Sequence, residues 1–387
     1  MEHLSSDYAW SRRDYLRLSA SGALAAAIAQ APSAAMAAPM AESQTRLTLD
    51  QCRQLSPLDM AGRSVTAVGS YHFLLKTADT IKDNSLRQAI SQILRQPAPT
   101  VMRRFASSTA KEEVRQQLVA EGLLMPDISI DQLFPPTIAA DAPPQAFLSA
   151  PGSGYMSHHA YPGGLSVHVA LNTRSSLGLF SGYRETFGLP LDRDIVLAAQ
   201  LLHDLHKPWV FQWQADGSAL TEYTVAGTGA HHILGIAESL YRGFPAAAVT
   251  AQASTHDHPG SPEDERKVVG YLKAGAIIAG VDPVKTGLLA SDGMTLPLPR
   301  KAELFVAHLG DHDWILSVPA AHWTVTLLGE IAAADYQMTA DDMKSAKFNA
   351  FRNYVFSQTT MIGLHQRHAI GGRDAVRTTV HALVAPV

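Results

Sequence analysis

Apolar residues recur at intervals of three and four along most of this 387-residue chain, and this spacing limits the fold more than any other feature. It places the apolar side chains on one face of a helix, where packing can bury them. Strand signals are scarce, and only 211–224, around Asp216-Gly217, predicts a short hairpin. We therefore predict an all-α fold, with helices in the following segments: 85–94, 112–124, 164–179, 192–206, 229–242, 245–256, 265–280, 302–309, 323–336 and 340–364.

Composition and proline placement indicate how the chain is organised. A hydrophobic content of 46% with 17% charged residues is enough to bury a large core. The Pro- and Ala-rich stretch 134–144 should interrupt helices. We expect the following parts: a signal peptide at 1–38, an N-terminal helical region at 45–134, a central catalytic bundle at 150–295 and a C-terminal helical region at 300–387.

The N-terminus is typical of an export signal. Residues 11–17, SRRDYLR, precede an apolar run over 18–31 and the sequence Ala35-Met36-Ala37, which fits a signal-peptidase site. That run is too short to serve as a stable membrane anchor. Because Arg12-Arg13 in this setting resembles a twin-arginine signal, we expect twin-arginine export machinery as a partner and a periplasmic location. An ordinary Sec signal is the alternative.

Charge and cysteine content restrict the chemistry. The formal net charge is -4, and acidic and basic residues are interspersed, so no large basic face is expected for capturing nucleic acid. Cys52 is the single cysteine, which excludes an intramolecular disulfide and a cluster of thiolate metal ligands. A metal ion in this chain must be held by His, Asp or Glu.

Histidines gather in one part of the chain, at positions 158, 159, 168, 203, 206, 231, 232, 256 and 258. Neutral imidazole binds borderline divalent metals, and a carboxylate can bridge two ions. Separated ligands converge if the helices form one bundle. We therefore predict a dinuclear site for two divalent ions, with Mn, Fe, Mg and Zn as candidates.

The order of these residues resembles the HD-domain phosphohydrolase superfamily over roughly 155–289. The segment HHAYPGGL at 158–165, followed by His168, is similar to the opening of HD-domain 3′-to-5′ exoribonucleases. His203-Asp204 with Lys207 resembles the namesake HDxxK segment, and Glu222-Tyr223-Thr224 also resembles that subgroup. The central range 150–295 would then be the HD domain.

The resemblance implies a ligand set and further site residues. One ion would be held by His168, His203, Asp204 and Asp282, and Asp204 would bridge to a second ion held by His231 and His256. His232 in place of His231, and His258 as an added ligand, stay open. Catalytic roles fall to Asp204, Lys207 and His206, and substrate binding to Lys207 and His159. His206 departs from the family pattern, where a small residue is usual, and it would narrow the pocket, donate a proton or face the interior.

Another polar group, formed by His308, Asp311, His312 and Asp313, lacks a partner motif, and we interpret it as a solvated loop. The sequence thus predicts an exported metal-dependent phosphohydrolase that cleaves a nucleotide or another small phosphorylated compound with a metal-activated water. Nucleic acid is the less favoured substrate, because no aromatic-rich basic strand face for single strands is recognisable. The alternatives are an HD-type di-iron oxygenase and a non-catalytic periplasmic metal-binding module.

Overall fold

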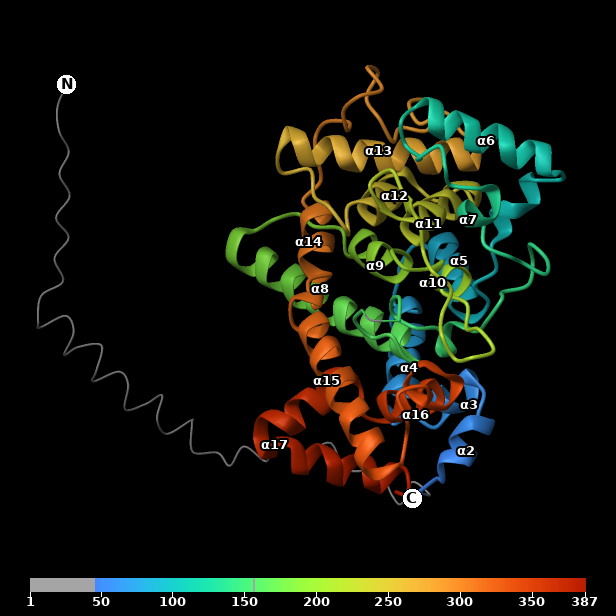
Figure 1. Cartoon of the computed structure of the whole chain (residues 1–387). Coiled ribbons are helices and arrows are strands. Elements are labelled where there is room, and N and C mark those ends of the chain that lie inside the picture. Colours follow the sequence, from blue (N-terminus) through green and yellow to red (C-terminus); the bar gives the residue numbers. More distant parts are fainter. Residues whose placement is uncertain (1–45, 156) are drawn as a thin grey trace, which may run out of the picture. The chain divides into compact units, whose positions relative to one another are not determined.

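The computed structural model describes residues 46–155 and 157–387, which form one compact unit from Arg46 to Val387 (Figure 1). The predicted signal peptide, 1–38, lies outside the described residues. Before the histidine-rich part the chain forms α2 (Leu49–Gln54), α3 (Pro57–Gly62), α4 (Val65–Ala78), α5 (Asn84–Arg95), η1 (Thr100–Arg104), α6 (Ser108–Ala120), α7 (Ile130–Leu133) and η2 (Phe147–Ser149).

The remaining elements confirm the all-α prediction. The central elements are α8 (Gly164–Phe187), α9 (Arg193–Leu202), α10 (Lys207–Val210), β1 (Thr224–Val225), β2 (Thr228–Gly229), α11 (Ala230–Tyr241), α12 (Ala246–Ala253) and α13 (Pro262–Ala279). The last elements are α14 (Glu303–Gly310), α15 (Trp314–Asp335), η3 (Asp342–Lys344), α16 (Ala346–Thr359) and α17 (Met361–Leu383). Among the described residues, strands are limited to the antiparallel pair β1 and β2. In the predicted hairpin at 211–224, a single bridge joins Trp213 to Ala219.

Local sequence signals set the ends of the helices. Thr48 and Ser56 begin α2 and α3 with capping boxes, in which side chain and backbone bond reciprocally. Ser261 caps α13 just before Pro262, whose fixed φ suits a first helical turn. Gly188 and Gly280 end α8 and α13 in left-handed conformations that a side chain would disfavour. The segment 134–146 contains no helix, as its prolines predict.

Two large apolar cores and one small cluster, formed by Phe180, Leu191, Val196 and Val306, hold the described helices together. The larger core contains buried residues of α4, α5, α8, α9 and α11–α13, and within it α8 packs against α4, α9 and α14. The second core joins α2 and α3 to α15–α17. Residues from the predicted N-terminal and C-terminal regions therefore pack against each other, and α14 enters the central bundle beside α8 and α9 (Figure 1).

The apolar stretch Glu303–Asp335, which comprises α14 and α15, is long enough and apolar enough to cross a membrane. Core helices pass the same test, and this stretch carries acidic residues at its centre. Asp311 and Asp313 lie between the two helices, and both are largely buried among histidines. This placement is typical of a core element.

The backbone before α8 requires glycine at both glycine positions of the HHAYPGGL segment. Gly163 adopts φ +92°, a conformation that residues with a side chain rarely take. A Cβ on Gly164 would lie 1.9 Å from the carbonyl oxygen of His159, which accepts a hydrogen bond from Gly152 N at 2.8 Å. The two glycines let the chain fold back tightly before α8, so that His159 faces the interior.

We predict that Gly164→Ala lowers the free energy of unfolding by about 1–3 kcal/mol, because the loop must move to admit the methyl group. Gly182→Ala on the exposed side of the same helix meets nothing within 4 Å. It should raise that free energy by roughly 0.5–1 kcal/mol through helix propensity. Urea denaturation of both variants measures the difference. Equal stability of Gly164→Ala and the parent protein would contradict the packing argument.

Candidate metal centre

The structure brings five of the six predicted ligands together from separate elements. His168 lies on α8, His203 follows the last turn of α9, and Asp204 comes next in the chain. His231 lies in the first turn of α11, and His256 follows the end of α12. A sixth residue, Asp311, joins them from the end of α14.

The first group of ligand atoms surrounds Asp204 Oδ2. The Nε2 atoms of His168 and His203 lie 3.1 and 3.2 Å from this oxygen. The same two nitrogens lie 3.3 and 3.7 Å from Asp311 Oδ1. Neighbouring ligands bound about 2.1 Å from one ion lie roughly 3.0–3.4 Å apart, so these spacings suit a shared ion with small adjustments.

The second group surrounds Asp204 Oδ1. His231 Nε2 lies 3.2 Å and His256 Nε2 3.9 Å from that oxygen. Asp311 Oδ2 is 3.7 Å from His256 Nε2. Asp204 therefore presents one oxygen to each pair of imidazoles, and Asp311 presents one oxygen to the first pair and the other to His256. Such an arrangement is expected of residues that bridge two ions.

Hydrogen bonds at the other ring nitrogen orient these imidazoles. His203 Nδ1 donates to the carbonyl of Gln200 at 2.8 Å, so its Nε2 carries a lone pair when the ring is neutral. His231 Nδ1 bonds Glu222 Oε1, which also accepts from the backbone N–H of His231 at 2.8 Å. His256 Nδ1 is 3.3 Å from Thr228 Oγ1. Such partners at the far nitrogen are typical of metal-binding histidines.

Buried polar atoms support the fit to metal ions. His203 Nε2, His231 Nε2 and both carboxylate oxygens of Asp204 are buried and make no aligned hydrogen bond, although Lys207 forms an ion pair with Asp204 Oδ2. Burying such atoms without partners costs free energy, and a divalent ion between them would satisfy them together. The donor set contains only nitrogen and oxygen, which suits Zn, Mn or Fe.

Several candidate ligands have shifted pKa values, so metal binding at this site would compete with protons. Burial lowers the pKa of His168, but the carboxylates of Asp313 and Asp204 outweigh it and raise that pKa to about 10. Burial also opposes the charged form of His231, whose pKa Glu222 and Asp204 nevertheless raise to about 9. Burial raises the pKa of Asp204, but His203 and Lys207 reverse this and hold it well below the usual range. A metal ion must displace the protons on His168 and His231, so its binding should strengthen as pH rises.

Asp282, the sixth predicted ligand, is not part of this cluster. Its side chain is 47% exposed and accepts hydrogen bonds from the backbone N–H groups of Val284 and Lys285. The residue follows α13, which packs mainly against α11. Asp311 takes its place, because α14 packs against both α8 and α9.

His206 points away from the cluster, which corrects its predicted catalytic role. Its fully buried ring stacks edge-on against Trp209, and its Nε2 lies 3.5 Å from Glu238 Oε2. Glu238 also accepts from the backbone N–H of Val101 at 2.8 Å. His206 thus faces the protein interior, one of the three alternatives that the sequence left open.

Two other predicted residues lie beside the ligands. Lys207 is buried, and its ammonium lies 2.6 Å from Asp204 Oδ2 and donates to the carbonyl of Gly152 at 2.5 Å. His159 is also buried, and both of its ring nitrogens are engaged, one by Tyr161 and one by Asp313. A direct contact between His159 and a substrate is therefore not supported.

At the two ligand positions that the sequence left open, the geometry favours His231 over His232 and His256 alone over His256 with His258. His232 Nε2 donates to the carbonyl of Ala253 at 3.1 Å, whereas His231 presents Nε2 to Asp204. His258 lies apart, since its Nδ1 accepts from Gly260 N and its ring lies edge-on to that of His308. The candidate ligands are His231 and His256.

Sequence reasoning missed Asp311 and Asp313, which it assigned to a solvated loop. The signal was the gathering of acidic and histidine side chains at 308–313 within an otherwise apolar stretch. Asn172, one turn after His168, was also missed, and its amide hydrogen-bonds Asp311. An i,i+4 pair of polar residues on one face of a buried helix was the available signal.

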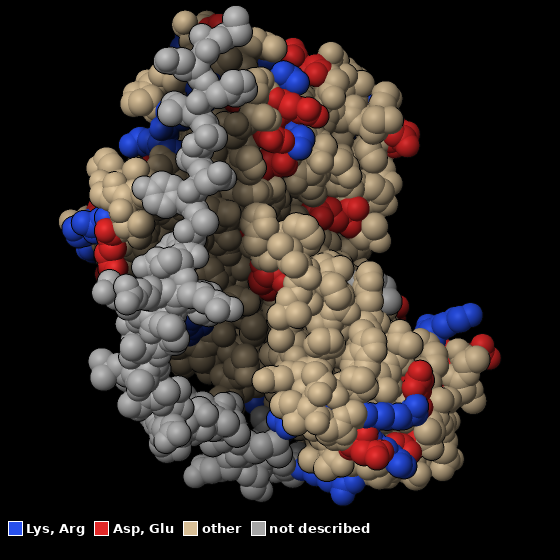
Figure 2. Space-filling view, turned by 90° about the vertical axis from the view of Figure 1, so that its left-hand side faces the viewer, with Lys and Arg blue, Asp and Glu red and all other residues tan. Residues whose placement is uncertain are grey.

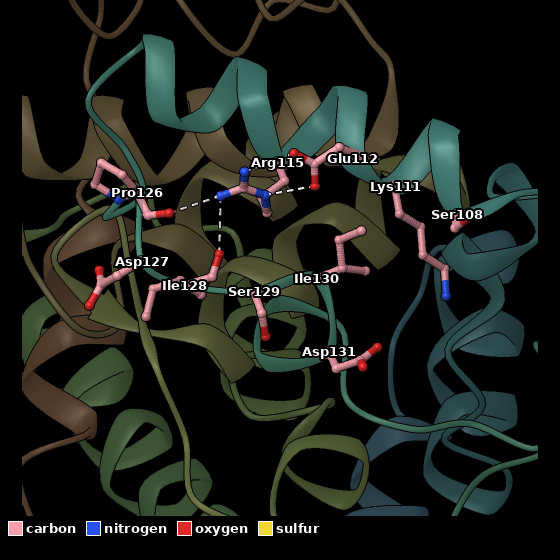
Figure 3. Close-up of a pocket in the computed structure, with 10 residues that line it drawn as sticks. All are labelled: Ser108, Lys111, Glu112, Arg115, Pro126, Asp127, Ile128, Ser129, Ile130 and Asp131. Carbon is pink, nitrogen blue, oxygen red and sulfur yellow. Dashed lines mark hydrogen bonds and ion pairs between the residues drawn. The ribbon is translucent and has the colours of Figure 1, made fainter.

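A surface groove of about 630 Å³ lies elsewhere, between α6 and the residues leading into α7 (Figure 3). Its Arg115 is engaged by Glu112 at 2.7 Å and by the carbonyls of Pro126 and Ile128. None of the residues lining this groove belongs to the histidine and aspartate cluster. The cluster is therefore the candidate functional site.

Four imidazoles around two carboxylates, held by separate helices, define a candidate binuclear metal centre. The chain is similar to a dihydroneopterin 2′,3′-cyclic phosphate phosphodiesterase from Methanocaldococcus jannaschii, with 28% identity over 200 residues. The match covers 51% of this chain and 64% of the relative's length. No family model and no solved structure matches the chain.

We predict that Asp311→Asn lowers the metal content, because it weakens the carboxylate that faces both imidazole pairs. Asp282→Asn is the matched control and should keep the full content, since Asp282 lies on the surface. Metal analysis after dialysis against a low concentration of Zn²⁺ measures both variants. The opposite pattern, with loss only in Asp282→Asn, would restore Asp282 as a ligand.

Proposed function

We propose that this protein is an exported, metal-dependent phosphohydrolase that cleaves a phosphoester with a metal-activated water. The observation that carries the proposal is the placement of Lys207 beside Asp204, at the edge of the cluster that would hold two ions. His168, His203, Asp204 and Asp311 would hold one ion, and His231 and His256 would share Asp204 and Asp311 in holding the second. Such ions lower the pKa of a bound water and neutralise negative charge on phosphate.

The protein's own residues would position the reacting groups. The Lys207 ammonium supplies a fixed positive charge for a non-bridging phosphate oxygen, because the carbonyl of Gly152 and the carboxylate of Asp204 hold it in place. Glu222 keeps the His231 ring in one orientation through Nδ1. His256 is the most exposed of the candidate ligands, at 19%, so we expect substrate to approach from its side.

The relative's name suggests the type of ester. That protein acts on a 2′,3′-cyclic phosphate, in which one phosphate bridges two neighbouring oxygens of a small molecule. We propose a small phosphodiester as the substrate of this chain, with nucleotides and other small phosphorylated compounds in the same class.

Long nucleic acids are less favoured partners. On the described surface that Figure 2 shows, basic and acidic side chains lie close together and do not form a continuous basic track. A protein that binds long nucleic acid tightly needs such a track to neutralise the phosphates of the nucleic acid. The di-iron oxygenase remains the competing enzyme class, and Lys207 favours the phosphohydrolase because a phosphoester carries the negative charge that this lysine would neutralise.

We predict that Lys207→Ala keeps its metal ions but loses phosphodiesterase activity. The expected loss is about 2–4 kcal/mol of transition-state stabilisation, by analogy with removal of one oxyanion donor. Hydrolysis of bis(p-nitrophenyl) phosphate and of a 2′,3′-cyclic nucleotide, measured with metal analysis, tests this. Lys273→Ala, at a half-buried lysine of α13 that is not among the candidate site residues, is the control and should retain activity.

If Lys207→Ala turns over both esters at the parent rate, the phosphate role is wrong. Iron-dependent oxygen consumption without ester hydrolysis by the parent protein would favour the oxygenase.

Export by the twin-arginine pathway is part of the proposal and rests on the sequence of residues 11–17. The pathway carries folded proteins, which suits a chain that would acquire its metal ions before export. We predict that replacing Arg12-Arg13 by Lys-Lys retains the precursor in the cytoplasm. Cell fractionation followed by immunoblotting measures this, and an unchanged periplasmic yield would favour the Sec pathway.

A further inference from the structure

Asp313 lies between two buried histidines beside the candidate metal centre. Its Oδ2 is 2.6 Å from His159 Nε2, and its Oδ1 is 3.1 Å from His168 Nδ1. The side chain of Asp313 is 8% exposed, and those of both histidines are 2% exposed. A carboxylate buried to this degree requires partners, and these two rings are the ones that the structure provides.

The other ring nitrogen of His159 also has a partner. Its Nδ1 lies 3.0 Å from the hydroxyl of Tyr161, which is fully buried against Phe356. The backbone of His159 has φ 51° and accepts a hydrogen bond from Gly152 N. This side chain is therefore fixed by the tight loop before α8 and has no free nitrogen for a substrate.

We propose that Asp313 is a positioning residue that orients His168 toward the first metal ion, and that His159 and Tyr161 hold Asp313 in place. Asp313 Oδ1 lies 3.1 Å from His168 Nδ1, and a small rotation of either side chain would align it to accept the Nδ1 proton. That tautomer leaves a lone pair on His168 Nε2, which lies beside Asp204, Asp311 and the Asn172 amide. The other three candidate ligands have acceptors of the same kind at Nδ1: the carbonyl of Gln200, the carboxylate of Glu222 and the hydroxyl of Thr228. A carboxylate behind a metal-bound imidazole fixes its tautomer and strengthens it as a ligand.

The sequence places Asp313 well for this task. Asp313 stands two residues after Asp311, at the start of α15. The short link between α14 and α15 therefore supplies both the candidate ligand Asp311 and the carboxylate behind the candidate ligand His168. The HHAYPGGL segment supplies His159 and Tyr161 from the opposite side. The inference assigns a role to His159 that differs from its predicted contact with substrate.

The inference rests on the metal centre of the proposed function, and the test separates the two. Co²⁺ is titrated into the metal-free protein while its visible absorption, which responds to the ligand field, is recorded. We expect two ions to bind in the parent protein. Asp313→Asn should bind the ion at His168 about 10- to 100-fold more weakly, with an altered absorption spectrum, and should leave the ion at His231 and His256 unchanged.

Asp335→Asn is the matched control. Asp335 is also a buried aspartate that pairs with a histidine, His381 Nε2 at 2.9 Å, and it lies at the far end of α15. This variant should leave both Co²⁺ affinities unchanged. If Asp313→Asn fails to fold, Asp313→Ser, which suits the start of a helix, serves in its place and should show the same selective loss.

Two unchanged affinities and an unchanged spectrum in the folded Asp313 variant would overturn the positioning role while leaving the metal centre intact. Binding of three ions by the parent protein and of two by the variant would overturn it too, because His159, His168 and Asp313 would then hold an ion themselves. No binding of Co²⁺ by the parent protein would instead contradict the metal centre of the proposed function.

Discussion

The carboxylate of Asp204 is the point on which the site depends. It is fully buried, and its two oxygens face different pairs of imidazoles, which come from α8, α9, α11 and the end of α12. Because a buried carboxylate without partners is costly, each of these elements must hold its side chain in place for the bundle to tolerate Asp204. The packing of α8 on α9 and of α11 on α12 is therefore tied to the chemistry of the centre.

The fold was largely predictable, because it follows from local patterns. Apolar spacing located the helices from α8 to α16 except the short α10, and the prolines at 134–144 marked a segment without helix. It missed α17 and the first turns of α15. Predicted ligands that lie in or directly beside these helices, such as His168 and the His203-Asp204 pair, meet in the structure. For these residues, their position on a helix face and their order in the family pattern were enough to predict that their side chains meet.

The remaining site residues depended on contacts between distant segments. Asp282 and Asp311 both follow an apolar helix, and no local pattern tells which of the two helices packs against α8 and α9. His206 adjoins Lys207 in the sequence, yet α10 turns one side chain toward Asp204 and the other toward Glu238. Asp313 looked solvated because its partners, His159 and His168, lie about 150 residues earlier in the chain.

The charges around the centre connect its metal content to its substrate. Without ions, the protons on His168 and His231 and the ammonium of Lys207 offset the surrounding carboxylates. When divalent ions replace those two protons, the local charge becomes more positive by about two units, since each ion brings one charge more than the proton it displaces. At low dielectric this change acts strongly on a bound anion. An anionic ligand would therefore be bound more favourably by a centre that holds ions than by a centre that holds protons.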